Sequence, residues 1–64
     1  MLVKFYQIQV KREGNYIPVC DIDYKDSEVD NELRTLRRHH PEYSFRKQYL
    51  YTQDMVVLTW RNLK

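Results

Sequence analysis

The sequence contains very little cysteine, glycine or proline. Among its 64 residues, Cys20 is the single cysteine and Gly14 the single glycine, and the prolines are Pro18 and Pro41. A lone cysteine excludes an internal disulfide, so the cysteine usage fits a reducing compartment. A single glycine excludes a glycine-rich loop of the kind that cradles phosphate groups.

Long apolar runs are missing as well. Residues 1–12 are interrupted by Lys4 and turn polar at Gln7, unlike the continuous apolar stretch of a signal peptide. No segment approaches the roughly 20 apolar residues of a membrane-spanning helix. We therefore expect a cytoplasmic chain that has no membrane partner.

The composition is nevertheless that of a folding chain. Hydrophobic residues make up 42% of it and charged residues 31%, which is unlike a disordered segment. A chain of this length forms one small domain, expected to span residues 1–64, and buries only a modest core. Without disulfides, its stability must come from dense packing, self-association or a bound partner. The formal charge of +2 hides an uneven distribution, because acidic residues crowd 21–32 and basic residues follow them.

Alternating polarity and turn residues predict two hairpins on either side of a helix. Strands are expected at residues 2–12, 16–23, 43–52 and 55–61. Gly14 supplies the positive φ that the first hairpin turn needs. Pro18 lacks a backbone N–H, so the second strand is expected at an edge of the sheet.

The segment between the hairpins carries the signals of a helix over residues 27–40. Ser27 is a good N-terminal cap, and Val29, Leu33 and Leu36 recur at helical spacing. Pro41 disfavours helical geometry in the residue before it, which ends the helix. The sequence therefore predicts an α+β fold of ββαββ order. Its four-stranded antiparallel sheet is expected in the order 2-1-3-4, with one helix packed on one face.

One face of this sheet is expected to form the core. Tyr43, Phe45, Tyr49 and Tyr51 share one parity of the third predicted strand, so they should face the helix together. Lys47 has the same parity and must extend outward from the core. Three apolar helical side chains are few to cover so many rings, which favours a dimer or a docked partner.

The opposite parity offers a different mixture of side chains. It combines Ile17, Val19 and Leu50 with Arg46 and with polar residues. Such a mixture is typical of a protein interface, in which an apolar centre is surrounded by a polar rim.

The sequence lacks a convincing catalytic or metal-binding motif. Three acids of segment 21–32 match positions of a calcium-binding loop, but Asp26 occupies the position that requires glycine. His39 and His40 are adjacent, and adjacent side chains lack the spacing of zinc ligands. We therefore expect no cofactor, no metal and no enzymatic activity.

These features predict a small non-enzymatic module that binds a larger host protein. Inhibitors or modulators of the kind that phages and mobile elements encode belong to this class. The predicted contacts come from the uncovered sheet face and from arginines on the helix. The residues are Ile17, Val19, Arg34, Arg38, Arg46, Gln48, Leu50 and Arg61.

Two alternatives remain open. In the first, basic residues contact phosphates of a nucleic acid while tyrosines stack on its bases. That set consists of Arg34, Arg38, Arg46, Lys47, Tyr49, Tyr51 and Arg61. In the second, a homodimer completes the core by pairing its sheet faces.

Overall fold

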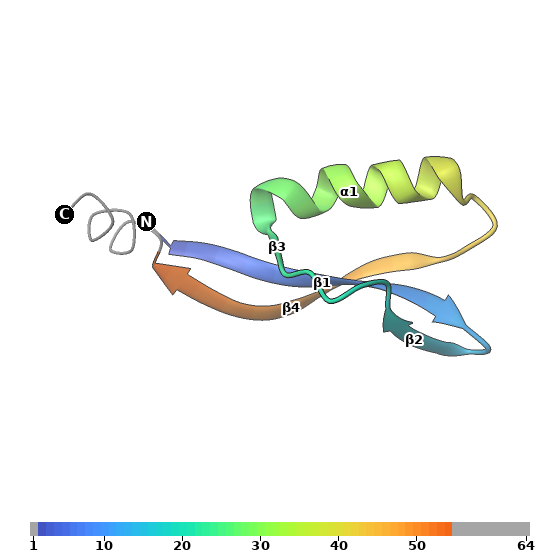
Figure 1. Cartoon of the computed structure of the whole chain (residues 1–64), viewed down its shortest axis with the longest axis horizontal. Coiled ribbons are helices and arrows are strands. Elements are labelled where there is room, and N and C mark those ends of the chain that lie inside the picture. Colours follow the sequence, from blue (N-terminus) through green and yellow to red (C-terminus); the bar gives the residue numbers. More distant parts are fainter. Residues whose placement is uncertain (1, 55–64) are drawn as a thin grey trace.

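A computed structural model describes residues 2–54 and shows an α+β fold (Figure 1). The elements are β1 (Leu2–Arg12), β2 (Asn15–Pro18), β3 (Tyr24–Lys25), α1 (Asp26–His39) and β4 (Phe45–Asp54). Within this part of the chain, four antiparallel strands form an open sheet and α1 lies over one side of it. The predicted fold class is therefore confirmed. The strand predicted at 55–61 lies outside the described residues.

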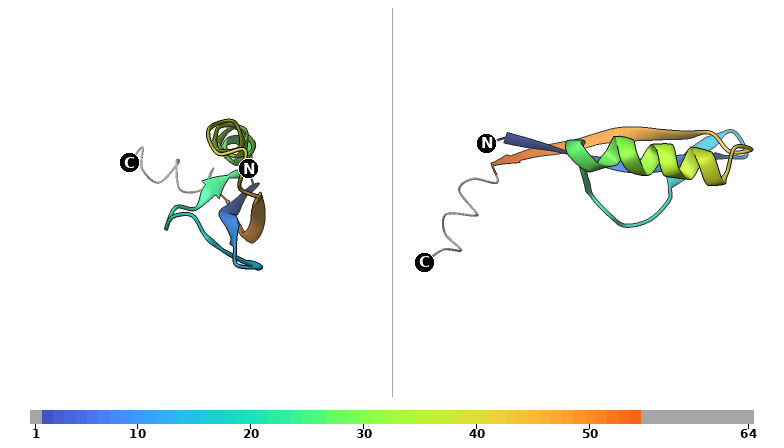
Figure 2. Two further views of the ribbon diagram at one scale, coloured as in Figure 1. Left: turned by 90° about the vertical axis from the view of Figure 1, so that its right-hand side faces the viewer. Right: turned by 90° about the horizontal axis from the view of Figure 1, so that it is seen from above.

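β1 is the central strand of the sheet. β4 pairs along one edge of β1, from Leu2 to Val10. β2 and β3 share the other edge, where β2 pairs with residues 9–12 and β3 with residues 5–6. The predicted neighbours of the first strand are thus confirmed, with β2 on one side and the strand after the helix on the other. Figure 2 shows the connection between β2 and β3 looping away from the sheet.

Pro18 ends β2 at the edge of the sheet, as its missing N–H predicts. The Val19 N–H donates to the Ile8 carbonyl at 2.9 Å, so residue 19 directs its backbone groups toward β1. Neighbouring residues of a strand direct these groups to opposite sides. Position 18 therefore faces away from β1, where a donor is not needed.

The second predicted strand was too long. The sheet pairing extends no further than residue 19, and the chain returns as β3 only at residue 24. Asp21 and Asp23 lie on the excursion between the two strands and remain exposed to solvent. Carboxylates are better hydrated outside the sheet than within it, so the chain leaves the sheet here. The alternating polarity of the sequence does not show where this departure occurs.

The helix starts two residues earlier than predicted, because its N-cap is Lys25 and not Ser27. The Glu28 side chain accepts a hydrogen bond from the Lys25 N–H at 3.2 Å, so this carboxylate supports the first turn in place of Ser27. At the other end, the His40 N–H donates to the Leu36 carbonyl at 2.8 Å. The helix therefore ends just before Pro41, as predicted.

The main core lies between α1 and the sheet. It consists of Ile8, Val10, Val29, Leu33 and Phe45. Tyr6, Tyr24 and Leu36 are partly buried against this cluster. The apolar stripe of the helix thus meets the expected residues of the first strand.

A β-bulge at Leu50 interrupts the ladder between β1 and β4. Phe5 lies opposite Tyr51 and Tyr6 lies opposite Tyr49, so Leu50 has no partner residue on β1. Phe5 and Tyr6 are consecutive, so their side chains point to opposite sides of the sheet. Directly opposite residues share one face, so Tyr51 lies on the face of Phe5 and Tyr49 on the face of Tyr6. Tyr49 and Tyr51 therefore lie on opposite faces, and the prediction that they share one face is wrong.

The turn from β1 to β2 consists of Glu13 and Gly14, and both have positive φ, 51° and 84°. This backbone geometry suits glycine and asparagine. Holding Glu13 in the left-handed conformation lowers the stability of the fold by about 1–2 kcal/mol. We predict that Glu13→Asn raises the free energy of unfolding by about 1 kcal/mol, measured by urea denaturation. Gly14→Ala should lower it instead. An unchanged midpoint for Glu13→Asn would contradict the turn geometry.

Candidate functional site

The side of the sheet that faces away from α1 is the first candidate surface, and we call it the open sheet face. Gln7 and Gln9 alternate with the core residue Ile8, so they point to this side. Within residues 2–54, no helix or strand lies over it. Its members include Val3, Phe5, Gln7, Gln9, Lys11, Tyr16, Arg46, Gln48, Tyr51 and Gln53.

One half of the open sheet face is a polar network centred on Arg46. The Arg46 Nε donates to the Gln9 Oε1 at 2.7 Å, and the Gln9 Nε2 donates to the Gln7 Oε1 at 3.0 Å. The Arg46 guanidinium also lies 4.0 Å from the centre of the Tyr16 ring. Among the described residues, no carboxylate pairs with Arg46. This half therefore presents a fixed positive charge with donors to spare.

The other half is aromatic. Tyr51 stacks on Phe5 with ring centres 4.9 Å apart, and Phe5 is only 8% exposed. The Tyr51 hydroxyl donates to the Asp23 Oδ2 at 3.1 Å. Partial burial and this hydrogen bond both raise the pKa of Tyr51. Tyr51 itself is 42% exposed, so its ring offers a flat apolar contact beside the polar half.

The predicted partner-binding residues do not all lie on this face. Arg46 and Gln48 do, as expected. Ile17 does not, because it lies opposite the core residue Val10 and therefore points to the side of the sheet that α1 covers. Val19 lines a pocket on that same side. The assignment of Ile17 and Val19 to the uncovered face is therefore wrong, and its cause is a one-residue error in the register of the second strand.

The remaining predicted contacts are spread over other surfaces. Arg34 and Arg38 are exposed on α1 and form no ion pair or hydrogen bond among the described residues. Leu50 occupies the bulge and is partly exposed. Arg61 lies outside the described residues.

The predicted nucleic-acid set is also divided between the two sides of the sheet. Lys47 points toward the helix, where its Nζ lies 3.0 Å from the Asp30 Oδ1. Tyr49 is on the same side, and its hydroxyl is 2.7 Å from that of Thr52. Arg46 and Tyr51 are on the open sheet face. The basic and aromatic residues of β4 therefore do not form one stacking platform.

A cysteine–tyrosine contact lies on the segment between β2 and the helix. The Cys20 sulfur is 3.6 Å from the Tyr24 hydroxyl. This hydrogen bond, partial burial and the nearby charges of Cys20, Glu32 and Glu28 raise the pKa of Tyr24 to about 12. Tyr24 therefore stays neutral as a hydrogen-bonding group. Within residues 2–54, no three His, Cys, Asp or Glu side chains come together as metal ligands.

The reasoning from sequence missed Val3, Phe5 and Tyr16 as members of the open sheet face. A signal for the first two was present in segment 2–12. Between residues 3 and 10, its apolar residues are odd-numbered at 3 and 5 but even-numbered at 6, 8 and 10. Such a change of parity within one strand indicates that both faces carry apolar residues.

Function has to be inferred from these surfaces. No protein family, curated protein or solved structure matches this chain. The helix in the described part of the chain is too short and too polar to span a bilayer.

Proposed function

We propose that this chain is a small, non-enzymatic protein-binding module that docks on a larger protein through the open sheet face. The observation that carries the proposal is that the stacked pair of Phe5 and Tyr51 lies on the same face of the sheet as the fixed guanidinium of Arg46. Aromatic residues and arginine provide most of the binding energy in many protein interfaces. An inhibitor or modulator from a phage or mobile element fits this class of function.

The geometry favours binding because the contact groups are already held in place. Arg46 is fixed by Gln9 and Tyr16, so it loses little conformational freedom when a partner arrives. Its charge lacks a carboxylate partner among the described residues. The complementary surface would present an apolar patch for Tyr51 and an acidic group for Arg46.

The arginines of the helix belong to a different surface. α1 lies on the side of the sheet opposite the open sheet face (Figure 2), and Arg34 and Arg38 are exposed residues of this helix. A flat partner surface reaches only one of the two sides. We therefore place the main contact on the open sheet face and not on the helix.

The test is an affinity pull-down with the full chain as bait, with and without nuclease treatment. We expect a stoichiometric protein partner that survives nuclease. Arg46→Glu should reduce its recovery by about tenfold or more, because the substitution reverses the charge at the centre of the contact. Lys4→Glu is the matched control, since it makes the same change of charge on the exposed side of β1 that faces away from this surface.

Other results would contradict the proposal. Recovery of only nuclease-sensitive material would support nucleic-acid binding. A partner that is lost equally with Arg46→Glu and Lys4→Glu would indicate a general charge effect and not docking on the open sheet face. Sedimentation that shifts with protein concentration, without any other partner, would support the homodimer.

A further inference from the structure

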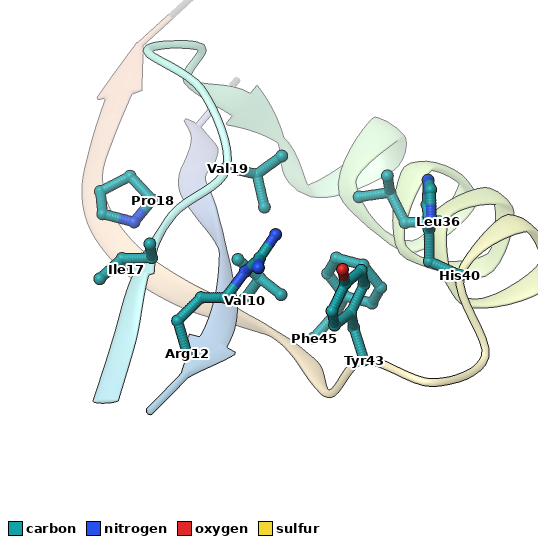
Figure 3. Close-up of a pocket in the computed structure, with 9 residues that line it drawn as sticks. All are labelled: Val10, Arg12, Ile17, Pro18, Val19, Leu36, His40, Tyr43 and Phe45. Carbon is teal, nitrogen blue, oxygen red and sulfur yellow. The ribbon is translucent and has the colours of Figure 1, made fainter. Parts of the chain in front are cut away.

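An open pocket of about 490 Å³ lies on the helix side of the sheet (Figure 3). Val10 and Phe45 form its floor, and Leu36 of α1 contributes one wall. Ile17 and Val19 contribute the opposite wall. The pocket therefore extends the apolar core to the surface at the C-terminal end of the helix.

The pocket exists because the helix does not reach across the whole sheet. α1 packs chiefly on β1, β4 and β3, and β2 lies beyond it. Ile17 is consequently 45% exposed, although it lies beside the core residue Val10. Tyr43 is also partly exposed at the same pocket. A group that fills the space would bury all of these side chains together.

Arg12 supplies a positive charge at the pocket. Its guanidinium lies 4.6 Å from the centre of the Tyr43 ring, which holds it against the apolar lining. No carboxylate among the described residues pairs with Arg12. His40, in contrast, has Glu42 at 3.6 Å. The unbalanced charge of the pocket is therefore that of Arg12.

We propose that this pocket binds a peptide segment of a partner protein in which a bulky aliphatic or aromatic residue is next to an acidic one. The bulky side chain would lie on Val10 and Phe45, and the carboxylate would pair with Arg12. The volume falls within the range of ordinary ligand pockets, and the open mouth lets a peptide backbone pass. The charge complementarity with Arg12 selects an acidic segment. This second site does not depend on the open sheet face.

The test begins with selection of phage-displayed random peptides on the immobilised full chain. Enriched peptides are synthesised, labelled and titrated by fluorescence anisotropy. Ile17→Ser removes an apolar wall of the pocket, and its matched control is Ile22→Ser, an exposed isoleucine outside the pocket. Arg12→Gln removes the charge, and its matched control is Lys11→Gln on the neighbouring residue. Circular dichroism checks that each variant is folded, and Val19→Ser replaces Ile17→Ser if that variant is not.

We expect the enriched peptides to combine a bulky apolar residue with Asp or Glu. Ile17→Ser should weaken their binding by about tenfold, because part of the buried apolar area is lost. Arg12→Gln should weaken it by about fivefold. A peptide whose acid is replaced by its amide should lose a similar amount and should no longer respond to Arg12→Gln, since the two changes remove the same ion pair. The controls should bind as the unmodified chain does.

Several outcomes would overturn this inference. Selection without enrichment would do so, as would enriched peptides that lack an acidic residue. Equal losses with Ile17→Ser and Ile22→Ser would show that the pocket is not the contact. Peptides that lose affinity with Arg46→Glu but not with Ile17→Ser would bind the open sheet face instead. That last result would leave the proposed function standing while removing the pocket as a site.

Discussion

Ile8→Ala is expected to leave a large fraction of the chain unfolded at 25 °C. Ile8 is 1% exposed and belongs to the cluster with Val29 and Leu33, so shortening it opens a cavity in the main core. Substitutions of this type cost about 2–5 kcal/mol. A single core of this size supplies only about 3–5 kcal/mol in total. The loss is therefore comparable to the whole stability of the domain.

Urea denaturation followed by far-ultraviolet circular dichroism measures this effect. The matched control is Ile22→Ala, because Ile22 is 52% exposed on the excursion between β2 and β3. The control should change the free energy of unfolding by no more than about 0.5 kcal/mol. A loss below about 1 kcal/mol for Ile8→Ala would contradict the placement of this residue at the centre of the core.

Gln9→Pro is expected to destabilise the fold by about 3 kcal/mol or more, although Gln9 is a polar residue on the open sheet face. Gln9 lies opposite Arg46 of β4. The Lys11 N–H donates to the Ser44 carbonyl at 2.9 Å, so Lys11, and with it Gln9, directs its backbone groups toward the β4 side. Proline at position 9 would remove a ladder hydrogen bond from the central strand.

Tyr16→Pro is the control for this second prediction. Residue 16 has the same parity as Pro18, so its N–H points away from β1 and no ladder bond is lost. Tyr16→Pro should lose the contact between the Tyr16 ring and Arg46. Measured by urea denaturation, it should nevertheless lower the free energy of unfolding by less than Gln9→Pro does. A larger loss for Tyr16→Pro would mean that β2 is not an edge strand.

Both predictions concern the scaffold that presents two separate surfaces. β1 contributes Val10 to the floor of the pocket and Gln9 to the open sheet face. Because neighbouring residues of one strand serve opposite sides, the two surfaces are close but do not overlap. Variants can therefore be chosen that change one surface and spare the other, as Ile17→Ser and Arg46→Glu do.

The sequence by itself determined the elements whose signals are local. The helix follows from the spacing of Val29, Leu33 and Leu36 and from Pro41 beyond its end, because helical periodicity and proline sterics act within a few residues. The edge position of β2 follows from Pro18, since a missing N–H is tolerated only where no strand accepts it. The protein-binding function and its residues stay predictions.

The tertiary structure alone decided which side of the sheet each residue faces. Reading faces from alternation assumes an unbroken strand with a known register, and the bulge at Leu50 moves Tyr51 to the face opposite Tyr49. The position of Ile17 opposite Val10 likewise depends on the pairing of two strands. Bulges and registers are set by contacts between residues far apart in the chain. The aromatic stack and the pocket therefore emerge only when those strands have paired.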